Sequence, residues 1–312
     1  MISFRLSRIL PPIFLPVIFF ALVILTGTIL LHHPISLTAA RISWTDALFT
    51  ATSAVCVTGL TVVDTGSYFT NFGQTVILVL IQLGGLGIMT FTSLAFYLVR
   101  QRVSLTDKIA VGQSLLPHNR FELGDFLKAM LLGTLILEGT GSLLLYLFAP
   151  SGFTPFSAVF HAVSAFCNAG FSLNSDSLIG FRNNWPVNLI IMFLIICGGL
   201  GFSVLLEARS LISLKFQAAG HLKGHKQPLS WYASVVLKTA AFLIFIGWFG
   251  IFMAEFVGFQ RHFSFSESVL AALFQSVTCR TAGFNTMNIH NMTNVSLFVM
   301  VVLMFIGGAP GS

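Results

Sequence analysis

Three segments of the sequence carry a glycine at the same position, and each could present backbone oxygens to a cation. They read FTATSAVCVTGL over 49–60, FHAVSAFCNAGF over 160–171 and LFQSVTCRTAGF over 273–284. The alignment places Gly59, Gly170 and Gly283 in register, 111 and 113 residues apart. A glycine can adopt φ > 0 or approach an axis closely, so that successive carbonyl groups face inward. Bared carbonyl oxygens can replace the hydration shell of a monovalent cation.

The candidate ion-binding residues are the four residues around each of these glycines. They are Val57, Thr58, Gly59 and Leu60; Asn168, Ala169, Gly170 and Phe171; and Thr281, Ala282, Gly283 and Phe284. The ligands would be backbone oxygens, so backbone shape should matter more than side-chain identity. The segments carry no ring of carboxylates, which argues against a calcium site. A single glycine would favour close helix packing, whereas three in a fixed frame favour an ion site.

The composition indicates that these segments lie within a membrane. Hydrophobic residues make up 55% of the 312 residues, charged residues only 8%, and the mean hydropathy is +0.90. A soluble domain carries about a quarter charged residues, so this chain lacks the surface that a soluble enzyme needs. The net charge of +6 comes without the clustered basic and aromatic residues of a nucleic-acid surface. We expect an integral membrane protein in contact with lipid and with no nucleic acid partner.

Six apolar stretches approach the length of about 20 residues that a transmembrane helix needs. They cover 10–31, 72–99, 129–149, 187–206, 239–258 and 293–312. Most lysine and arginine residues fall before the first stretch and in the loops after the second and fourth. The positive-inside rule then places these loops and the N-terminus in the cytoplasm. We expect a multi-pass protein of the cell membrane.

A shorter segment lies between the two stretches of each pair, at 44–56, 154–167 and 266–279. Each begins with a helix-start signal: Ser43 with Asp46, Thr154 before Pro155, and Ser264 with Glu267. Helices of this length run about 20 Å, which is a little more than half a bilayer. They would begin at the outer face and end just before their glycines. Their partially negative C-terminal ends would then point at a common centre, and irregular backbone at that depth requires surrounding protein or a water-filled cavity.

The pattern divides the chain into tandem repeats of span, pore helix, filter and span, an all-α integral membrane fold. Repeat 1 covers 1–108, with spans 10–31 and 72–99, pore helix 44–56 and filter 57–61. Repeat 2 covers 109–222, with spans 129–149 and 187–206, pore helix 154–167 and filter 168–172. Repeat 3 covers 223–312, with span 239–258, pore helix 266–279, filter 281–285 and a partial span 293–312.

Other residues with chemical potential receive structural interpretations. The pairs Gly84-Gly85 and Gly198-Gly199 are expected to act as hinges or packing sites rather than ion contacts. Three ionisable residues are expected within the membrane, where a charge is costly and usually serves a function: Glu138, Glu255 and Arg280. Arg280 could pair with a carboxylate or brace its loop by donating to carbonyls; bracing is favoured, because a bare cation on the axis would repel the permeant ion. The four cysteines are expected to be core residues, and His221 and His225 to be solvated loop residues rather than metal ligands.

The three glycine segments, together with the terminal run Gly307-Gly308-Ala309-Pro310-Gly311, resemble the Trk/Ktr/HKT superfamily of potassium transporters. The resemblance covers the whole chain and is strongest to the bacterial KtrB-type ion-translocating subunit. It implies four tandem repeats around a pseudo-fourfold pore, of which this chain holds three, the third incomplete. It also implies potassium uptake, passive or sodium-assisted, with K⁺ and possibly coupled Na⁺ as substrates and no cofactor. A glycine at Gly59 implies preference for potassium over sodium.

The resemblance further implies a gate and protein partners. The gate would be Gly307, Gly308, Ala309, Pro310 and Gly311, where glycines and a proline cannot sustain a helix. The partners would be a second copy in a homodimer and a cytoplasmic nucleotide-binding regulatory ring of the KtrA/TrkA type, docked on the loops 100–128 and 209–238. Because the chain stops inside the third repeat, we expect a fragment of a longer product that does not conduct alone.

Two alternative functions are weaker. A secondary transporter of another solute would hold a midplane site in broken helices and is typical of inverted repeats, whereas the charge pattern gives these three repeats one orientation. An intramembrane enzyme would need a catalytic motif, and the sequence contains neither H-E-x-x-H nor G-x-S-x-G. We therefore expect that the chain is not an enzyme.

Overall fold

The computed structural model describes residues 15–38, 41–100, 123–202, 204–207, 230–258 and 264–309. Within these ranges the chain is helical, and its only sheet-like pairing is an isolated bridge between Leu37 and Phe69. The helices of the first repeat are α2 (Leu15–His32), α3 (Trp44–Val55), α4 (Thr65–Tyr68) and α5 (Asn71–Arg100). Those of the second are α7 (Leu123–Phe148), α8 (Pro155–Phe166) and α9 (Trp185–Gly199); those of the third are α11 (Trp231–Gly258), α12 (Phe265–Thr278) and α13 (Asn294–Ile306).

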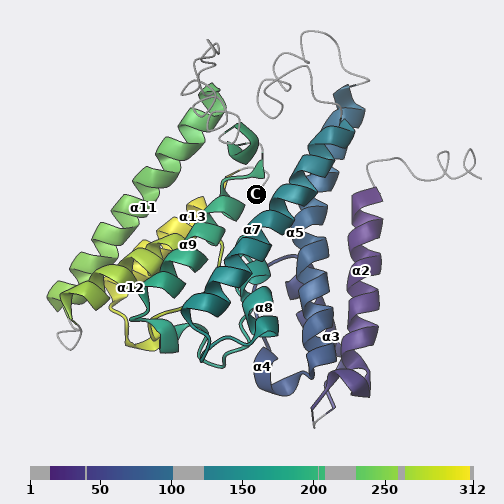
Figure 1. Cartoon of the computed structure of the whole chain (residues 1–312), viewed down its shortest axis with the longest axis horizontal. Helices are drawn as coiled ribbons and strands as arrows, with labels where there is room; N and C mark the ends of the chain where they lie inside the picture. Colours follow the sequence, from purple (N-terminus) through teal and green to yellow (C-terminus); the bar gives the residue numbers. More distant parts are fainter. Residues whose placement is uncertain are drawn as a thin grey trace, which may run out of the picture.

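The helices are arranged in three similar groups, each with one short helix packed against a long one. The short helix α3 packs on α2, α8 on α7, and α12 on α11. Figure 1 shows the chain progressing across the molecule, from α2 (purple) through α7 (teal) to α11 (green). Neighbouring groups also touch, through contacts of α5 with α8 and of α9 with α12. The short helices α3 and α8 also pack on the second long helix of their own groups, α5 and α9.

Each short helix begins at a side-chain cap, as the sequence predicted. The Ser43 Oγ accepts a hydrogen bond from the Asp46 N–H at 3.0 Å, and the Thr154 Oγ1 accepts one from the Ser157 N–H at 3.1 Å. At Ser264 the full capping box forms, because the Glu267 carboxylate also accepts the Ser264 N–H. These caps satisfy N–H groups that a helix start leaves unpaired, so they fix where each short helix begins.

Two of the second spans end earlier than the expected ranges of 187–206 and 293–312. Helix α9 ends at Gly199, and Gly201 adopts φ 78° before helical backbone resumes at Phe202. Helix α13 ends at Ile306, where Gly307 adopts φ 68°. A positive φ cannot continue a right-handed helix, so both spans are interrupted at glycines. Residues 10–14 of the first expected span lie outside the described ranges.

Two of the described helical stretches have both the length and the apolarity to cross a membrane, Lys128–Phe148 and Trp231–Glu255. The other apolar stretches are shorter, among them Pro16–His32, Asn71–Gly87, Trp185–Gly199 and Asn294–Ile306. The distribution of apolar residues supports a membrane environment for all of them. Small residues such as Ala47, Ala51 and Ala54 are fully buried on the short helix α3, whereas large ones such as Phe298 and Phe305 face outward on α13. Exposed apolar surface of this extent suits lipid rather than water.

Candidate functional site

The three glycine loops share an unusual backbone conformation. Gly59, Gly170 and Gly283 adopt φ of 73°, 70° and 82°. Two residues earlier in each loop a non-glycine residue is also left-handed: Val57 at 56°, Asn168 at 57° and Thr281 at 82°. Such conformations cost about 1–3 kcal/mol each and persist only where the surroundings impose them. The same strained pattern therefore occurs at the same two positions of all three loops.

Hydrogen bonds from the loops to the short helices fix the direction of the carbonyl groups. The Thr58 N–H donates to the Ser53 carbonyl at 2.9 Å, the Ala169 N–H to the Ser164 carbonyl at 2.7 Å, and the Ala282 N–H to the Thr278 carbonyl at 2.9 Å. In a planar trans peptide, the carbonyl group points opposite to the N–H group. The preceding carbonyls, those of Val57, Asn168 and Thr281, therefore point away from their short helices.

The three loops also lie directly beside one another. A Cβ atom added to Gly59 would overlap the Ala169 carbonyl oxygen, and one added to Gly170 would lie 2.5 Å from the Ala282 carbonyl oxygen. A Cβ added to Gly283 would lie 3.5 Å from the Cα of Gly170. The first two glycines thus leave space for the backbone of the next loop, and the third lies against the backbone of the loop before it. The structure brings together the candidate residues from all three segments.

Polar side chains behind the second loop hold its backbone, and the sequence had not singled them out. The fully buried His161 of α8 hydrogen-bonds through Nε2 to the Ser172 hydroxyl at 3.0 Å. The buried Ser164 hydroxyl donates to the Phe171 carbonyl at 2.7 Å. In the first loop, the Thr58 hydroxyl donates to the Ser53 hydroxyl at 2.9 Å. A histidine within an otherwise apolar short helix was the signal that could have identified this support.

The glycines of the second spans pack against the ends of the short helices. A Cβ on Gly84 would overlap the Val55 carbonyl oxygen, and a Cβ on Gly198 would overlap the Phe166 carbonyl oxygen. Val55 and Phe166 occupy equivalent positions, at the last residue of α3 and of α8. The close packing predicted for these glycines is therefore present, and it brings the second span of each of these two repeats up to its loop.

The two carboxylates expected within the spans have separate hydrogen-bond partners. Arg280 is 6% exposed, and its Nε has no acceptor among the described residues. Glu255 instead accepts the Thr293 N–H at 2.8 Å and the Thr293 hydroxyl at 3.0 Å, at the N-terminus of α13. Glu138 accepts a hydrogen bond from the Gln82 amide at 3.2 Å. In the described part of the chain, neither carboxylate forms an ion pair with Arg280. All four cysteines are free.

The segment proposed as a gate follows the end of α13. After Gly307, the Ala309 N–H donates to the carbonyl of Gly199 at 3.1 Å, so this segment touches the interruption after α9. Pro310 and Gly311 lie outside the described residues. So does most of the two basic loops expected to receive the regulatory ring, including His221 and His225.

Comparison with known proteins was made on both sequence and structure. Residues 14–312 match the family model described as "TrkH: Cation transport protein". The Ktr system potassium uptake protein B of Bacillus subtilis is 38% identical over 98% of this chain, and its namesake from Vibrio alginolyticus is 35% identical over 93%. The potassium/sodium uptake protein NtpJ of Enterococcus hirae is 33% identical over 94%. The chain spans 67%, 63% and 64% of these relatives' lengths.

The crystal structure of the potassium transporter TrkH from Vibrio parahaemolyticus has a similar fold, with a TM-score of 0.64 and 24% identity. The match covers 94% of this chain and 57% of that one. It confirms the predicted all-α membrane fold, and the named relatives confirm that the chain is not an enzyme, since they are ion transporters. The family match over nearly the whole length and the identity to the Ktr proteins together show that this chain belongs to the TrkH family of cation transport proteins.

Proposed function

We propose that this protein takes up potassium across the cell membrane through a selectivity filter of backbone carbonyls, as the translocating subunit of a Ktr/Trk-type system. The observation that carries the proposal is the succession of the three loops, in which each of the first two glycines contacts the carbonyl group of the next loop. Residues far apart in sequence thereby form one continuous array of carbonyl groups.

The physical basis is the replacement of water by carbonyl oxygens. A monovalent cation sheds its hydration shell only where oxygens of similar number and strength replace it. The carbonyls of Val57, Asn168 and Thr281 point away from the short helices that hold them, and the helix C-termini add partial negative charge. The candidate residues include no carboxylate, so the field suits a monovalent rather than a divalent ion.

Partners and orientation form part of the same proposal. The relatives belong by name to a Ktr system, which supports a complex with other components. We infer a homodimer seated on a cytoplasmic ring of nucleotide-binding subunits, with the basic loops and the N-terminus in the cytoplasm. The repeat boundaries given above, with pore helices at α3, α8 and α12, belong to this proposal. The four-repeat, pseudo-fourfold arrangement rests on the family resemblance.

The proposal includes two modes of transport, passive potassium uptake and potassium uptake assisted by sodium. One relative is named as a potassium/sodium uptake protein, which supports sodium as a second substrate. Preference for potassium over sodium is what the family resemblance implies for a glycine at Gly59, whose left-handed φ and close approach to the Ala169 carbonyl leave no room for a side chain.

A secondary transporter of another solute is the alternative function. The interruptions of α9 and α13 at Gly199–Gly201 and Gly307 favour it, because broken helices at the midplane form solute sites in such transporters. Against it, all three repeats have one orientation by their charge pattern and place equivalent glycines side by side. Competition of rubidium influx by unlabelled K⁺, with no competition by amino acids or sugars, separates the two functions.

The decisive experiment is rubidium influx into cells that lack potassium uptake and express the complete gene product, with and without Gly59→Ser. The serine Cβ would overlap the Ala169 carbonyl at a φ that L-residues rarely adopt. We therefore expect growth rescue by the unaltered protein and at least a tenfold loss of K⁺/Na⁺ discrimination in the variant.

Gly180→Ser is the matched control, because a Cβ there meets open space, and it should transport normally. If Gly59→Ser discriminates as well as the unaltered protein, the filter assignment is wrong.

A further inference from the structure

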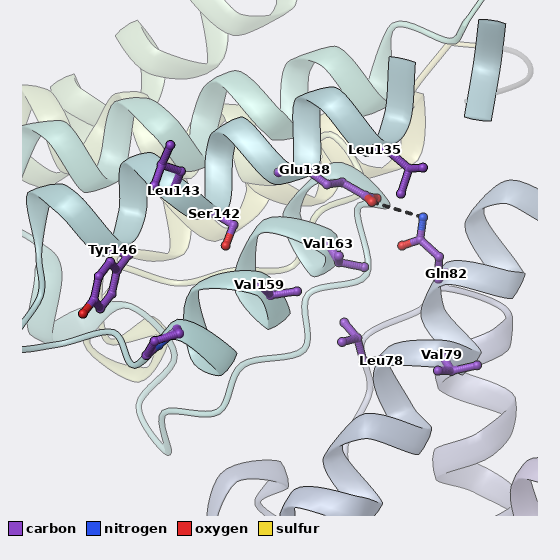
Figure 2. Close-up of a pocket in the computed structure, with 12 residues that line it drawn as sticks. Leu78, Val79, Gln82, Leu135, Glu138, Ser142, Leu143, Tyr146, Val159 and Val163 are labelled. Carbon is purple, nitrogen blue, oxygen red and sulfur yellow. Dashed lines mark hydrogen bonds between the residues drawn. The ribbon is translucent and has the colours of Figure 1, made fainter. Parts of the chain in front are cut away.

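A cavity of about 620 Å³ lies between α5, α7 and α8, where the first two repeats meet. Figure 2 shows aliphatic side chains around it, contributed by all three helices. Leu135 and Leu143 of α7 and Val79 of α5 remain about half exposed, at 63%, 57% and 49%. The cavity therefore opens on the outer, apolar surface, where we expect lipid. Its volume falls within the usual range for small-molecule sites.

On one wall of this cavity, the oxygens that accept hydrogen bonds outnumber the groups that donate them. Glu138 is only 6% exposed, and its carboxylate accepts hydrogen bonds from the Gln82 amide at 3.2 Å and from the Cys167 thiol at 3.9 Å. Figure 2 shows the Gln82 and Glu138 side chains pointing toward each other from α5 and α7. The Gln82 Oε1 is buried and has no donor. No lysine, arginine or histidine lines the cavity in the described part of the chain.

A carboxylate at this position is costly unless a cation accompanies it. Glu138 lies ten residues before the C-terminal end of α7 at Phe148, which is about 15 Å along the helix. Intramembrane acids are rare and normally face a partner, and a buried charge without one is strongly unfavourable. The Gln82 amide and the Cys167 thiol donate hydrogen bonds but supply no charge. A positively charged group with several donors would supply both the charge and the donors that these contacts lack.

We propose that this cavity binds a primary alkylammonium, a cation on an apolar chain that enters from the membrane. An ammonium group carries three N–H donors and no acceptor, which fits the Glu138 carboxylate together with the unpaired Gln82 Oε1. The alkyl chain would lie along Leu78, Val159 and Val163, which line the remainder of the cavity.

Two other occupants fit less well. A dehydrated alkali ion needs a full set of oxygen ligands in place of its water, and this cavity is lined mainly by aliphatic side chains. A neutral acyl chain would fill the apolar part but would offer the carboxylate no positive charge and the Gln82 Oε1 no donor. Charge complementarity therefore favours the ammonium.

The position of Glu138 links the cavity to the candidate filter. Cys167, which contacts the Glu138 carboxylate, is the C-cap of α8 and directly precedes Asn168. A ligand that draws the carboxylate toward the cavity would change its contact with the residue that begins the second loop. Reduced rubidium influx on binding is the consequence, and this consequence alone rests on the proposed function.

The test measures binding of radiolabelled n-decylammonium to the full-length protein in lipid nanodiscs, with uptake by empty nanodiscs subtracted. We expect saturable binding that 1-decanol, of equal chain length, displaces at least tenfold less effectively than unlabelled n-decylammonium. Glu138→Gln should weaken binding at least tenfold. Val159→Trp, which fills the cavity, should abolish it while Glu138 stays in place.

Glu267→Gln is the matched control, because it removes a carboxylate from an exposed cap and should leave binding unchanged. If Glu138→Gln does not fold, Gln82→Leu and Val159→Trp carry the test, since both keep the carboxylate. Equal displacement by decanol would identify an acyl-chain site only and overturn the proposal. Unchanged binding in Glu138→Gln, or in both Gln82→Leu and Val159→Trp, would overturn it as well. None of these results depends on whether the protein transports potassium.

Discussion

The Ser164 hydroxyl shows how a single side chain can set the backbone of a loop. It lies within α8, and it donates to the carbonyl of Phe171, one residue beyond Gly170. This bond turns the Phe171 carbonyl back toward the short helix. In the proposed filter, the Phe171 carbonyl would therefore support the loop rather than face an ion, unlike the role expected for it from the sequence.

Replacing Ser164 with alanine should therefore disturb the second loop. The buried Phe171 carbonyl would lose its donor, at a cost of about 1–3 kcal/mol, and the loop would relax. We expect a lower midpoint in thermal unfolding and reduced K⁺/Na⁺ discrimination in rubidium influx. The matched change Ser268→Ala removes an exposed bond to the Ser264 carbonyl and should alter neither. Normal discrimination in Ser164→Ala would show that the Phe171 carbonyl does not need this donor.

At the scale of elements, the third repeat is fastened by a carboxylate at a helix start. Glu255 of α11 accepts both the N–H and the hydroxyl of Thr293, which is the N-cap of α13. A negative charge at a helix N-terminus also interacts favourably with the helix dipole. This role accounts for one of the two carboxylates within the spans without invoking the ion.

Glu255→Ala should loosen α13 from α11. It removes the acceptor of two hydrogen bonds and leaves the half-buried Thr293 N–H unpaired, which should destabilise the protein by about 2 kcal/mol. Glu255→Gln keeps an acceptor oxygen and should lose less, because only the interaction of the charge with the dipole disappears. Thermal unfolding of the two purified variants would measure which of them is less stable. A glutamine variant as unstable as the alanine variant would assign the effect to the charge instead.

At the scale of the whole molecule, the second and third repeats are joined beyond their glycine loops as well as through them. The Leu178 N–H donates to the Asn285 carbonyl at 2.9 Å, and the Asn285 N–H donates to the Ser177 hydroxyl at 3.1 Å. These bonds connect segments more than 100 residues apart, following the second and third loops. The proposed orientation places this connection at the outer face.

A pair of cysteines at Ser177 and Asn285 should therefore form a disulfide. The two residues exchange hydrogen bonds through their local segments, so their Cα atoms should fall within the span that a disulfide requires. We expect a membrane-impermeant oxidant, added outside intact cells, to form this disulfide. Proteolysis between the two positions should then yield two fragments that stay linked until the disulfide is reduced. Each single variant is the control. If the disulfide formed only after the oxidant was given access to the cytoplasm, the proposed orientation would be wrong. The contact between the two segments would still be supported.

Much of this architecture could be predicted from local signals in the sequence. The caps at Ser43 and Ser264 depend on residues three positions apart, and the cap at Thr154 depends on the proline that follows it. The apolar stretches depend on composition. All of these signals can be read from the sequence without a structure. The spacing of Gly59, Gly170 and Gly283 indicated equivalent loops because a repeat preserves its landmarks.

Only the tertiary structure decided how these parts meet. The left-handed backbone at Val57 and Thr281 is imposed by surrounding contacts, because neither residue type favours it. The contact of Gly59 with the Ala169 carbonyl and the pairing of Gln82 with Glu138 join residues that no periodicity relates. The sequence by itself determined a membrane protein with three equivalent glycine loops, since local propensity and burial in lipid are properties of short segments. The order of the loops and the cavity beside them depend on long-range packing, which only the folded chain specifies.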